Sequence, residues 1–278
     1  VEAFEAEWAA YCGTAHAVGV GNGTDALHLA LRAARIGPGD EVIIPALTAT
    51  FTALAVSLSG ATPVVADVDP ERYTLAPRTF EAALTPRTAA VIPVHLYGCP
   101  ADMEAILEIA RRHGLFVLED AAQAHGARYR GTRVGALADA AAFSFYPSKN
   151  LGAYGDAGAV TTNDAALAEK VRMLRHGGQR TTYEHEVLGV NSRLDEIQAA
   201  ILRAKLPHLD AWNRRRRSLA ARYDTRLPAG GELTRPAAPE EAEHVYHQYV
   251  IRTSVRDALR GYLDGAGVST SVHYPRPV

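Results

Sequence analysis

Short apolar stretches alternate with helical patterns along most of this sequence, and this alternation constrains the fold more than any other feature. The helical patterns cover residues 24–37, 48–60, 100–114 and 164–178. The strand-like stretches are apolar on both faces, as expected of strands buried between helices. They lie at residues 16–20, 41–45, 62–69, 87–98, 115–120, 140–147 and 158–163. The sequence therefore predicts an α/β fold with a mainly parallel seven-stranded sheet sandwiched by helices.

The last quarter of the chain breaks this pattern. Residues 1–205 contain all seven predicted strands and are expected to form one large domain, whereas residues 206–278 carry a different set of elements. The long helix near 194–226 is interrupted at Pro207, and a linker, a strand (244–252) and a helix (256–267) follow. We interpret residues 206–278 as a long helix and the start of an incomplete small α+β domain. Because the chain begins without methionine and stops at Pro-Val, we expect both ends to be cut from something longer.

Composition excludes several classes of function. The net charge is −2, so no basic field is present to hold nucleic acid or an anionic membrane. No apolar run approaches the roughly 18 residues of a membrane helix, and the two cysteines of the chain form no disulfide framework. These features predict a cytoplasmic protein. The WNRRRR run at 212–217 could mark a polyanion site, but a solvated helix face is the interpretation that the acidic balance favours.

Lys149 stands in an unusual context for a lysine. It lies in FSFYPSKNLGAYGDAG (143–158), after a buried strand and before a glycine-rich stretch. Ligands of parallel α/β sheets bind at the carboxyl ends of strands, where this lysine is expected. Lys149 therefore either points from the end of the sheet into a pocket or is a surface lysine in a loop.

Asp120 ends another predicted strand, LFVLED, at the same edge. A buried carboxylate is costly unless it is paired with a cation. The partner could be one of the arginines at 128, 130 and 133, or the protonated nitrogen of a pyridoxal ring, which acts as an electron sink. Gln123 could then hydrogen-bond the phenolic oxygen of such a ring, or be an ordinary loop amide.

A candidate phosphate site precedes these residues in the chain. VGVGNGTDAL (18–27) runs from a strand through a glycine turn into a helix, so backbone N–H groups of Gly23, Thr24 and Asp25 would favour an anion. An ordinary helix cap by Asn22 or Thr24 would explain the same residues. The stretch has neither the GxGxxG spacing of a dinucleotide fold nor the ending of a P-loop. The hydroxyl of Ser144 could join the same phosphate.

Taken together, a lysine, a carboxylate, an amide and a phosphate cradle fit pyridoxal phosphate better than a nicotinamide or a nucleotide. The sequence resembles the DegT/DnrJ/EryC1/StrS sugar aminotransferases, within the aspartate aminotransferase-like fold type I enzymes. The resemblance is carried by VEAFEAEWAAYCGTAHAVGVGNGTDAL, GATPVVADVDP, VIPVHLYGCPADME, LEDAAQAHGA, FSFYPSKNLGAYGDAGAVTT and GVNSRLDEIQAAILRAKLPHLD. These stretches follow one another in the order of the family and span almost the whole chain.

The resemblance implies a role for each candidate residue. Lys149 would carry pyridoxal 5'-phosphate and Asp120 would face the ring nitrogen, with Gln123 on the ring oxygen. Contacts to the phosphate would come from Gly23, Thr24, Asp25 and Ser144, and Asn191 of GVNSRLDE would reach the phosphate of the neighbouring subunit. The family pattern thus implies a homodimer with shared active sites and no metal ion. Tyr154 and His273 are candidate substrate contacts.

The resemblance also implies the reaction. An amino group would pass from L-glutamate to a nucleotide-linked keto sugar, with dTDP as the expected nucleotide. Lys149 favours an aminotransferase, because dehydratases of the family carry histidine there. HLYGCPADM and YPSKNLG look more like the enzymes that aminate C-3 than those that aminate C-4. The alternatives are another fold type I enzyme, such as a lyase or dehydratase, and a non-catalytic regulatory relative.

One departure from the family concerns the cofactor ring. Ala49 stands where family members usually carry an aromatic residue that stacks on the ring. Phe51 is the nearby aromatic residue, but on a helix it would point elsewhere. Either another group covers the ring or the stacking is weaker.

Overall fold

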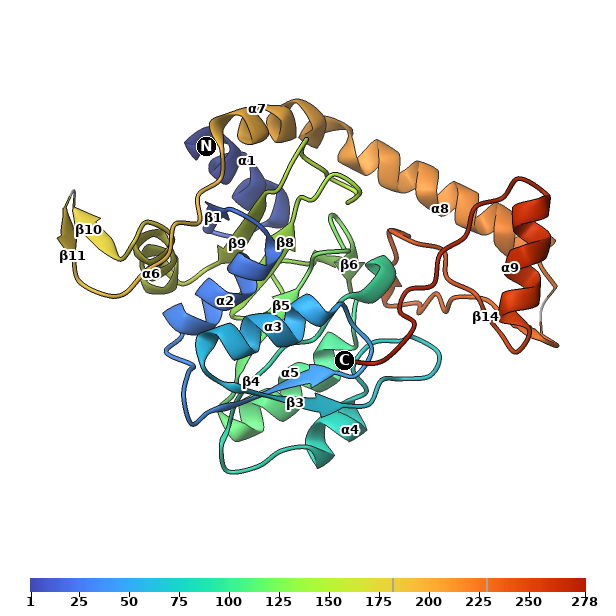
Figure 1. The fold of residues 1–278 in the computed structure, drawn as a ribbon, viewed down its shortest axis with the longest axis horizontal. Coiled ribbons are helices and arrows are strands. Elements are labelled where there is room, and N and C mark those ends of the chain that lie inside the picture. Colours follow the sequence, from blue (N-terminus) through green and yellow to red (C-terminus); the bar gives the residue numbers. More distant parts are fainter. Residues whose placement is uncertain (182, 229) are drawn as a thin grey trace.

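A single seven-stranded sheet forms the centre of the molecule. The computed structural model describes residues 1–181, 183–228 and 230–278. The strands of the sheet are β1 (His16–Val20), β2 (Glu41–Pro45), β3 (Thr62–Ala66), β4 (Thr88–Val91), β5 (Phe116–Asp120), β8 (Ala140–Ser144) and β9 (Gly158–Thr162). They lie side by side in the order β1-β9-β8-β5-β4-β2-β3 (Figure 1).

The sheet is parallel except for one strand. β8, β5, β4, β2 and β3 pair in parallel, whereas β9 pairs antiparallel with both β8 and β1. This confirms the predicted fold class and the mainly parallel sheet. The register aligns Val20 and Ser144 with Gly158, and Asp120 with Ala142. The carboxyl ends of β1, β8 and β5 therefore meet at one edge of the sheet.

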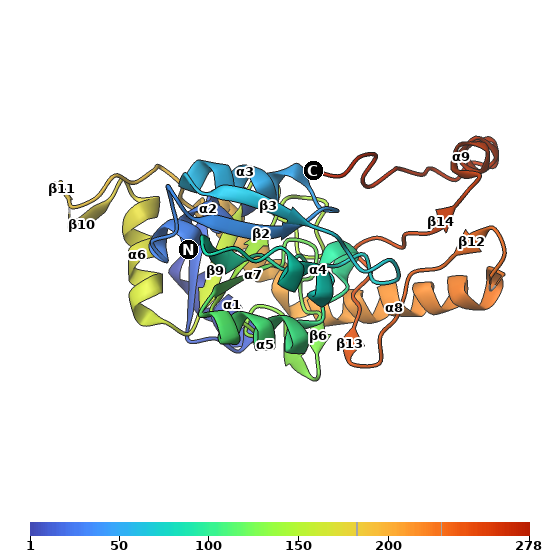
Figure 2. The ribbon, with the colours of Figure 1, turned by 90° about the horizontal axis from the view of Figure 1, so that it is seen from below.

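Helices cover both faces of the sheet, as the two-sided apolar strands require. One face is covered by α2 (Gly23–Ala33), α3 (Thr50–Ser59) and α6 (Ala165–Arg175), which pack on alternate strand residues such as Val42 and Ile44. The other face receives residues such as Ile43 and is covered by α1 (Glu2–Cys12), α4 (Pro77–Ala82), α5 (Met103–His113) and α7 (Glu196–Lys205). Figure 2 shows α2 and α3 on one side of the strands and α1 and α5 on the other.

Two predicted elements of this part differ from the structure. The strand expected at 87–98 ends at Val91, and a 3₁₀ turn, η1 (Leu96–Gly98), follows in which Tyr97 and Gly98 have φ of 58° and 95°. Such left-handed backbone does not continue a strand. The helix expected at 48–60 is slightly shorter, since α3 spans Thr50–Ser59, and its Phe51 is 62% exposed.

The chain beyond the sheet leads away from it. After α7, Pro207 lies in a 3₁₀ turn, η2 (Leu206–His208), and α8 (Leu209–Arg226) continues, which agrees with the predicted break. β12 (Leu233–Thr234) pairs with β14 (Arg252–Thr253), and α9 (Arg256–Gly265) follows. Figure 1 shows α8 extending from the body of the molecule towards α9. The division at residue 205 remains a prediction. No helix in the described ranges is both long and apolar enough to cross a membrane.

The strand predicted at 244–252 is wrong. β13 (Ala242–Glu243) pairs with β6 (Arg128–Tyr129), which also pairs with β7 (Thr132–Arg133), and regular pairing resumes only at β14. Between them Tyr246 has a φ of 45° and its N–H donates to Nδ1 of His244. The N–H of Val245 donates to the carbonyl of Gly98. This stretch therefore folds against the turn after β4 instead of joining a sheet.

Candidate active site

Asp120 occupies the carboxyl end of β5 and is almost fully buried. Its Oδ2 accepts a 2.8 Å hydrogen bond from the hydroxyl of Thr52, and its Oδ1 accepts one of 3.2 Å from the N–H of Ala122. Burial raises the pKa of Asp120, while these two hydrogen bonds and the positive charge of Lys149 oppose the rise. The carboxylate is thus held in place but lacks a full counter-charge.

The arginines that could have neutralised Asp120 point elsewhere. Arg130 pairs with Glu104 at 2.6 Å and Arg133 with Asp210 at 3.1 Å. Arg128 lies 3.9 Å from Glu243. Within the described ranges no arginine forms a salt bridge with Asp120, so the arginine interpretation of this carboxylate is wrong.

Lys149 lies in the turn after β8, where its N–H donates to the carbonyl of Tyr146 at 2.8 Å. Its side chain is half-buried, and burial lowers the pKa of its amine, although Asp120 opposes this shift. In the part of the chain that the structure describes, Nζ of Lys149 has no hydrogen bond or salt bridge, unlike Lys205, which donates to the carbonyl of Gly152. A half-buried amine with a lowered pKa suits a nucleophile and is unusual for a surface lysine.

The start of α2 is both a capped helix and an anion site. Oδ1 of Asn22 accepts from the N–H of Asp25 at 2.9 Å, which is an ordinary N-cap. The N–H groups of Gly23 and Thr24 have no acceptor among the described residues, so they remain available to an anion at the positive end of the helix. The two interpretations of this stretch are therefore compatible, but the N–H of Asp25 serves the cap.

The side chain of Asp25 is also engaged within the protein. Its Oδ2 accepts from Nδ2 of Asn22 at 3.0 Å and from the hydroxyl of Ser192 at 2.6 Å. The oxygen of that hydroxyl accepts from the N–H of Gly21 at 2.9 Å. Asn191, the residue before Ser192, is exposed. Ser192 therefore ties the stretch that carries Asn191 to the glycine turn, a contact that the sequence did not reveal.

Gly23 brings α2 against the end of β8. A Cβ atom on Gly23 would lie 2.6 Å from Cβ of Ser144, closer than side chains can approach. Only glycine lets the helix start this near to Ser144. The free N–H groups of α2 and the hydroxyl of Ser144 are thus brought to one place, as a phosphate cradle requires.

Gln123 is fixed between two tyrosines in this structure. Its Oε1 accepts from the N–H of Tyr97 at 2.7 Å, and its Nε2 donates to the hydroxyl of Tyr274 at 3.0 Å. The hydroxyl of Tyr97 in turn donates to the carbonyl of His273. Gln123 therefore joins the turn after β4 to the end of the chain, and its contact with a ring oxygen remains a prediction. The sequence reasoning missed both tyrosines and Thr52, which carried no motif of their own.

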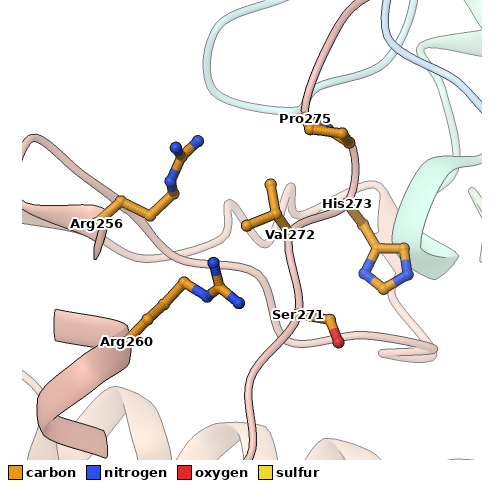
Figure 3. Close-up of a pocket in the computed structure, with 6 residues that line it drawn as sticks. All are labelled: Arg256, Arg260, Ser271, Val272, His273 and Pro275. Carbon is orange, nitrogen blue, oxygen red and sulfur yellow. The ribbon is translucent and has the colours of Figure 1, made fainter. Parts of the chain in front are cut away.

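The two candidate substrate contacts lie in different surroundings. His273 lines a cavity of about 500 Å³ together with Arg256, Arg260, Ser271, Val272 and Pro275. Figure 3 shows its imidazole pointing away from the two arginines. The ring of Tyr154 is exposed and lies under Nζ of Lys205, 4.3 Å from the ring centroid, and its backbone is held by Gln198. The structure thus connects His273, through Tyr97, to Gln123 and leaves Tyr154 at the surface.

At position 49, where family members usually carry the stacking aromatic residue, this chain has only the small side chain of alanine. Ala49 is the N-cap residue of α3, and Phe51 is turned outward, as expected. Tyr274 packs on the cluster of Val94, Leu96 and Tyr97 that Leu47 also contacts. Tyr274 is therefore an aromatic ring near this part of the chain, although it comes from a distant part of the sequence.

Glu119, next to Asp120, anchors the carboxyl end of β5 from the opposite face. It is fully buried, and its carboxylate lies 3.0 Å from Nε2 of His95. It also accepts from the N–H groups of Gly135, Leu137 and Ala138. Because Nδ1 of His95 accepts from the N–H of Ala101, Nε2 carries the proton and donates to Glu119. This buried network fixes the strand end that presents Asp120.

These residues fit pyridoxal phosphate by the chemistry of their groups. Among the described residues the amine of Lys149 and the N–H groups at the start of α2 have no partner, and the carboxylate of Asp120 lacks a full counter-charge. These groups match the aldehyde, the phosphate and the ring nitrogen of that cofactor. All three come from the same edge of the sheet.

Comparison with known proteins gives an independent result. The model of the DegT/DnrJ/EryC1/StrS aminotransferase family matches residues 1–278. The chain is 57% identical over 278 residues to a dTDP-3-amino-3,4,6-trideoxy-alpha-D-glucose transaminase of Streptomyces venezuelae, covering 100% of this chain and 73% of that protein. It is 54% identical over 275 residues to a UDP-N-acetyl-3-dehydro-alpha-D-glucosamine 3-aminotransferase of Acidithiobacillus ferrooxidans, covering 99% and 74%.

A solved structure agrees with these relatives. The crystal structure of S. venezuelae DesV in complex with a ketimine intermediate superimposes with a TM-score of 0.97 at 57% identity, covering 99% of this chain and 74% of that chain. The fold type I architecture expected from the sequence is therefore confirmed.

Proposed function

Because this chain belongs to the DegT/DnrJ/EryC1/StrS aminotransferase family, whose enzymes depend on pyridoxal phosphate, we propose that it aminates C-3 of a nucleotide-linked keto sugar. The observation that carries the proposal is the half-buried amine of Lys149, free of a partner among the described residues and influenced by the charge of Asp120. The names of the two relatives, each a 3-amino or 3-aminotransferase enzyme, support C-3 over C-4. The product would serve amino-sugar biosynthesis.

The residues of the site would divide the work as follows. Pyridoxal phosphate, when bound, supplies an electron sink for the carbon that exchanges its amino group. Asp120 would keep a proton on the ring nitrogen, and Thr52 and Ala122 hold Asp120. Gly23, Thr24 and Ser144 would bind the phosphate and thereby orient the ring. Lys149 would hold the cofactor and then move a proton at the reacting carbon, for which a lowered pKa is suited.

The amino donor and the nucleotide are further parts of the proposal. L-Glutamate is the proposed donor, and dTDP is the proposed nucleotide because the transaminase of S. venezuelae is named for a dTDP sugar. The relative from A. ferrooxidans is named for a UDP sugar, so the nucleotide requires a direct comparison. A lyase or dehydratase reaction is not favoured, since both relatives are named as aminotransferases.

We also propose a homodimer in which Asn191 of one subunit reaches the phosphate site of the other. Support comes from the exposure of Asn191 and from Ser192, which fixes its position beside the glycine turn. Residues 1–205 would form the cofactor-binding domain, and residues 206–278 would begin the small domain. A cytoplasmic location is consistent with Cys12 and Cys99, which are free and buried.

The proposal is tested with the purified chain, pyridoxal phosphate and L-glutamate. Keto-sugar substrates of dTDP and UDP with the ketone at C-3 or C-4 would be offered in parallel. Formation of 2-oxoglutarate and of an amino group at C-3, detected by mass spectrometry and NMR, is the expected result. Amination at C-4, or release of water or ammonia without transfer, would contradict it.

A further inference from the structure

Asn150 follows Lys149 directly, and its buried carboxamide is bonded on three sides. Its Nδ2 donates to Oδ1 of Asn213 at 2.9 Å and to the carbonyl of Val245 at 3.2 Å. Its Oδ1 lies 3.2 Å from Nδ1 of His247. An amide oxygen can only accept, so Nδ1 of His247 carries the proton and donates. The residue next to the lysine is thereby fixed at both polar atoms of its side chain.

α8 carries one partner of this carboxamide, Asn213, and also contacts the segment that carries the other two. Asn213 is buried, and its Nδ2 donates to the carbonyl of His125 at 2.8 Å. Arg216 lies one turn further along α8, and its Nη1 donates to the carbonyls of Tyr246 at 3.0 Å and His247 at 3.3 Å. These two side chains belong to the WNRRRR run and turn inward, whereas Arg214 and Arg215 are exposed. The prediction of a solvated helix face therefore holds for Arg214 and Arg215 but not for Asn213 and Arg216.

Breaking this network would be costly. A buried amide that loses its partner keeps the full cost of its desolvation. Networks of fully satisfied buried amides also select one arrangement of the segments that they join. The turn after β8, α8 and residues 244–248 therefore hold one another in a single relative position.

The relative position of these three segments also sets the surroundings of Lys149. The titratable groups that influence it or respond to it are Asp120 at the end of β5, His125 in the following loop and His247. Arg216 and His273 act on His247 in turn. Burial, followed by the charges of Lys149, Arg216 and His273, lowers the pKa of His247 to about 3, so its imidazole is neutral and can donate from Nδ1 to Asn150 at neutral pH.

We propose that Asn150 is a positioning residue for Lys149, because its carboxamide ties the lysine turn to α8 through Asn213 and to residues 244–248 through His247. The amine of Lys149 is held in its half-buried place only while both of these elements are docked. The inference rests on the proposed role of Lys149 and adds that residues from the C-terminal quarter of the chain set its position.

The test is the pH dependence with which an acetylating reagent, acetic anhydride, labels Lys149 in the cofactor-free chain. Each labelling curve is normalised to its own plateau, and Lys170 serves as internal reference. Asn213→Leu and His247→Leu should each move the midpoint for Lys149 upward by about one pH unit, a tenfold fall in neutral amine at fixed pH. The physical reason is that a lysine released into water loses the burial that lowers its pKa.

His247→Asn supplies the matched rescue, because its amide N–H lies near the place of Nδ1 and can still donate to Asn150. In His247→Asn the labelling midpoint of Lys149 should equal that of the unaltered chain. The same is expected of Arg215→Ala, which changes the exposed face of α8. If Asn213→Leu does not fold, the two variants of His247 decide the question. Equal midpoints in His247→Leu and His247→Asn would overturn the positioning role.

A second measurement separates failure of this inference from failure of the proposed function. Reduction of the cofactor-loaded unaltered chain with borohydride shows which lysine carries pyridoxal phosphate. Attachment at Lys149 together with unchanged midpoints in both leucine variants would overturn the positioning role alone. Attachment at another lysine would overturn the proposed function.

Discussion

The hydroxyl of Thr52 on α3 donates a 2.8 Å hydrogen bond to Oδ2 of Asp120 at the end of β5. Both groups are buried, and Thr52 also lies 3.0 Å from the hydroxyl of Thr48. A hydrogen bond to a buried carboxylate favours its charged form and thereby opposes the rise in pKa that burial causes. Thr52 therefore helps to keep Asp120 in the form that can face a protonated ring nitrogen.

Replacement of Thr52 by valine keeps the shape of the side chain and removes this donor. A hydrogen bond to a charged group contributes about 1.5–3 kcal/mol, so Thr52→Val should lower kcat for the glutamate half-reaction by about tenfold or more. Stopped-flow absorbance with the loaded chain measures the rate. Ser57→Ala, on an exposed position of the same helix, is the control and should keep the full rate. An unchanged rate in Thr52→Val would refute this role.

The close approach of Gly23 to Ser144 can be tested through cofactor affinity. A Cβ atom at position 23 would lie 2.6 Å from Cβ of Ser144, so Gly23→Ala must push the start of α2 away from β8. We expect the Kd for pyridoxal phosphate to rise by about tenfold or more, since at least one contact to a charged phosphate is lost. Gly261→Ala on α9, where the added Cβ meets nothing within 4 Å, should leave the Kd unchanged. Equal Kd values in the two variants would show that Gly23 does not shape the phosphate site.

The stability of the chain should depend on pH through buried histidines. Burial lowers the pKa of His125 and of His244 to about 3 each. In the unfolded chain they titrate near about 6.5, so below that pH the unfolded chain binds protons that the folded chain does not. The free energy of unfolding should therefore fall by about 3 kcal/mol between about pH 7.5 and 5.5 from these two residues. Urea unfolding at both pH values measures it.

His125→Phe provides the matched variant for this prediction. The imidazole lies among Trp8, Phe143 and Phe145, and neither of its nitrogens has a hydrogen-bond partner among the described residues. A phenyl ring fits these surroundings and cannot be protonated, so about half of the pH effect should disappear. His113→Gln, at an exposed position, should retain the full effect. If the free energy of unfolding of His125→Phe falls between these two pH values by as much as that of the unaltered chain, this account is contradicted.

The sequence predicts the sheet and its functional edge well because those features are local. Strands that are apolar on both faces need helices on both sides, and the register then brings Asp120, Ser144 and the start of α2 to one edge. The predicted strand at 244–252 fails for the opposite reason. A strand exists only with a partner, and the backbone of Val245 pairs with Gly98 in a turn that the sequence alone did not reveal.

The missed residues share a second physical cause. Thr52, Asn213 and His247 act through contacts to segments far away in the sequence, and each is an unremarkable residue in its own stretch. Asn213 stands in a run of arginines that reads as a solvated face, yet it is almost fully buried. Such residues become visible only when the partner segment is in place, so pattern and spacing cannot identify them.

The identity of the lysine that carries the cofactor tests the central claim most directly. The chain has three lysines, Lys149, Lys170 and Lys205, so borohydride reduction of the cofactor-loaded chain, proteolysis and mass spectrometry give an unambiguous answer. We expect the added mass on the peptide that contains Lys149, and none after Lys149→Ala. Equal labelling of Lys170 or Lys205, or undiminished labelling of Lys149→Ala, would contradict the assignment of this edge of the sheet as the active site.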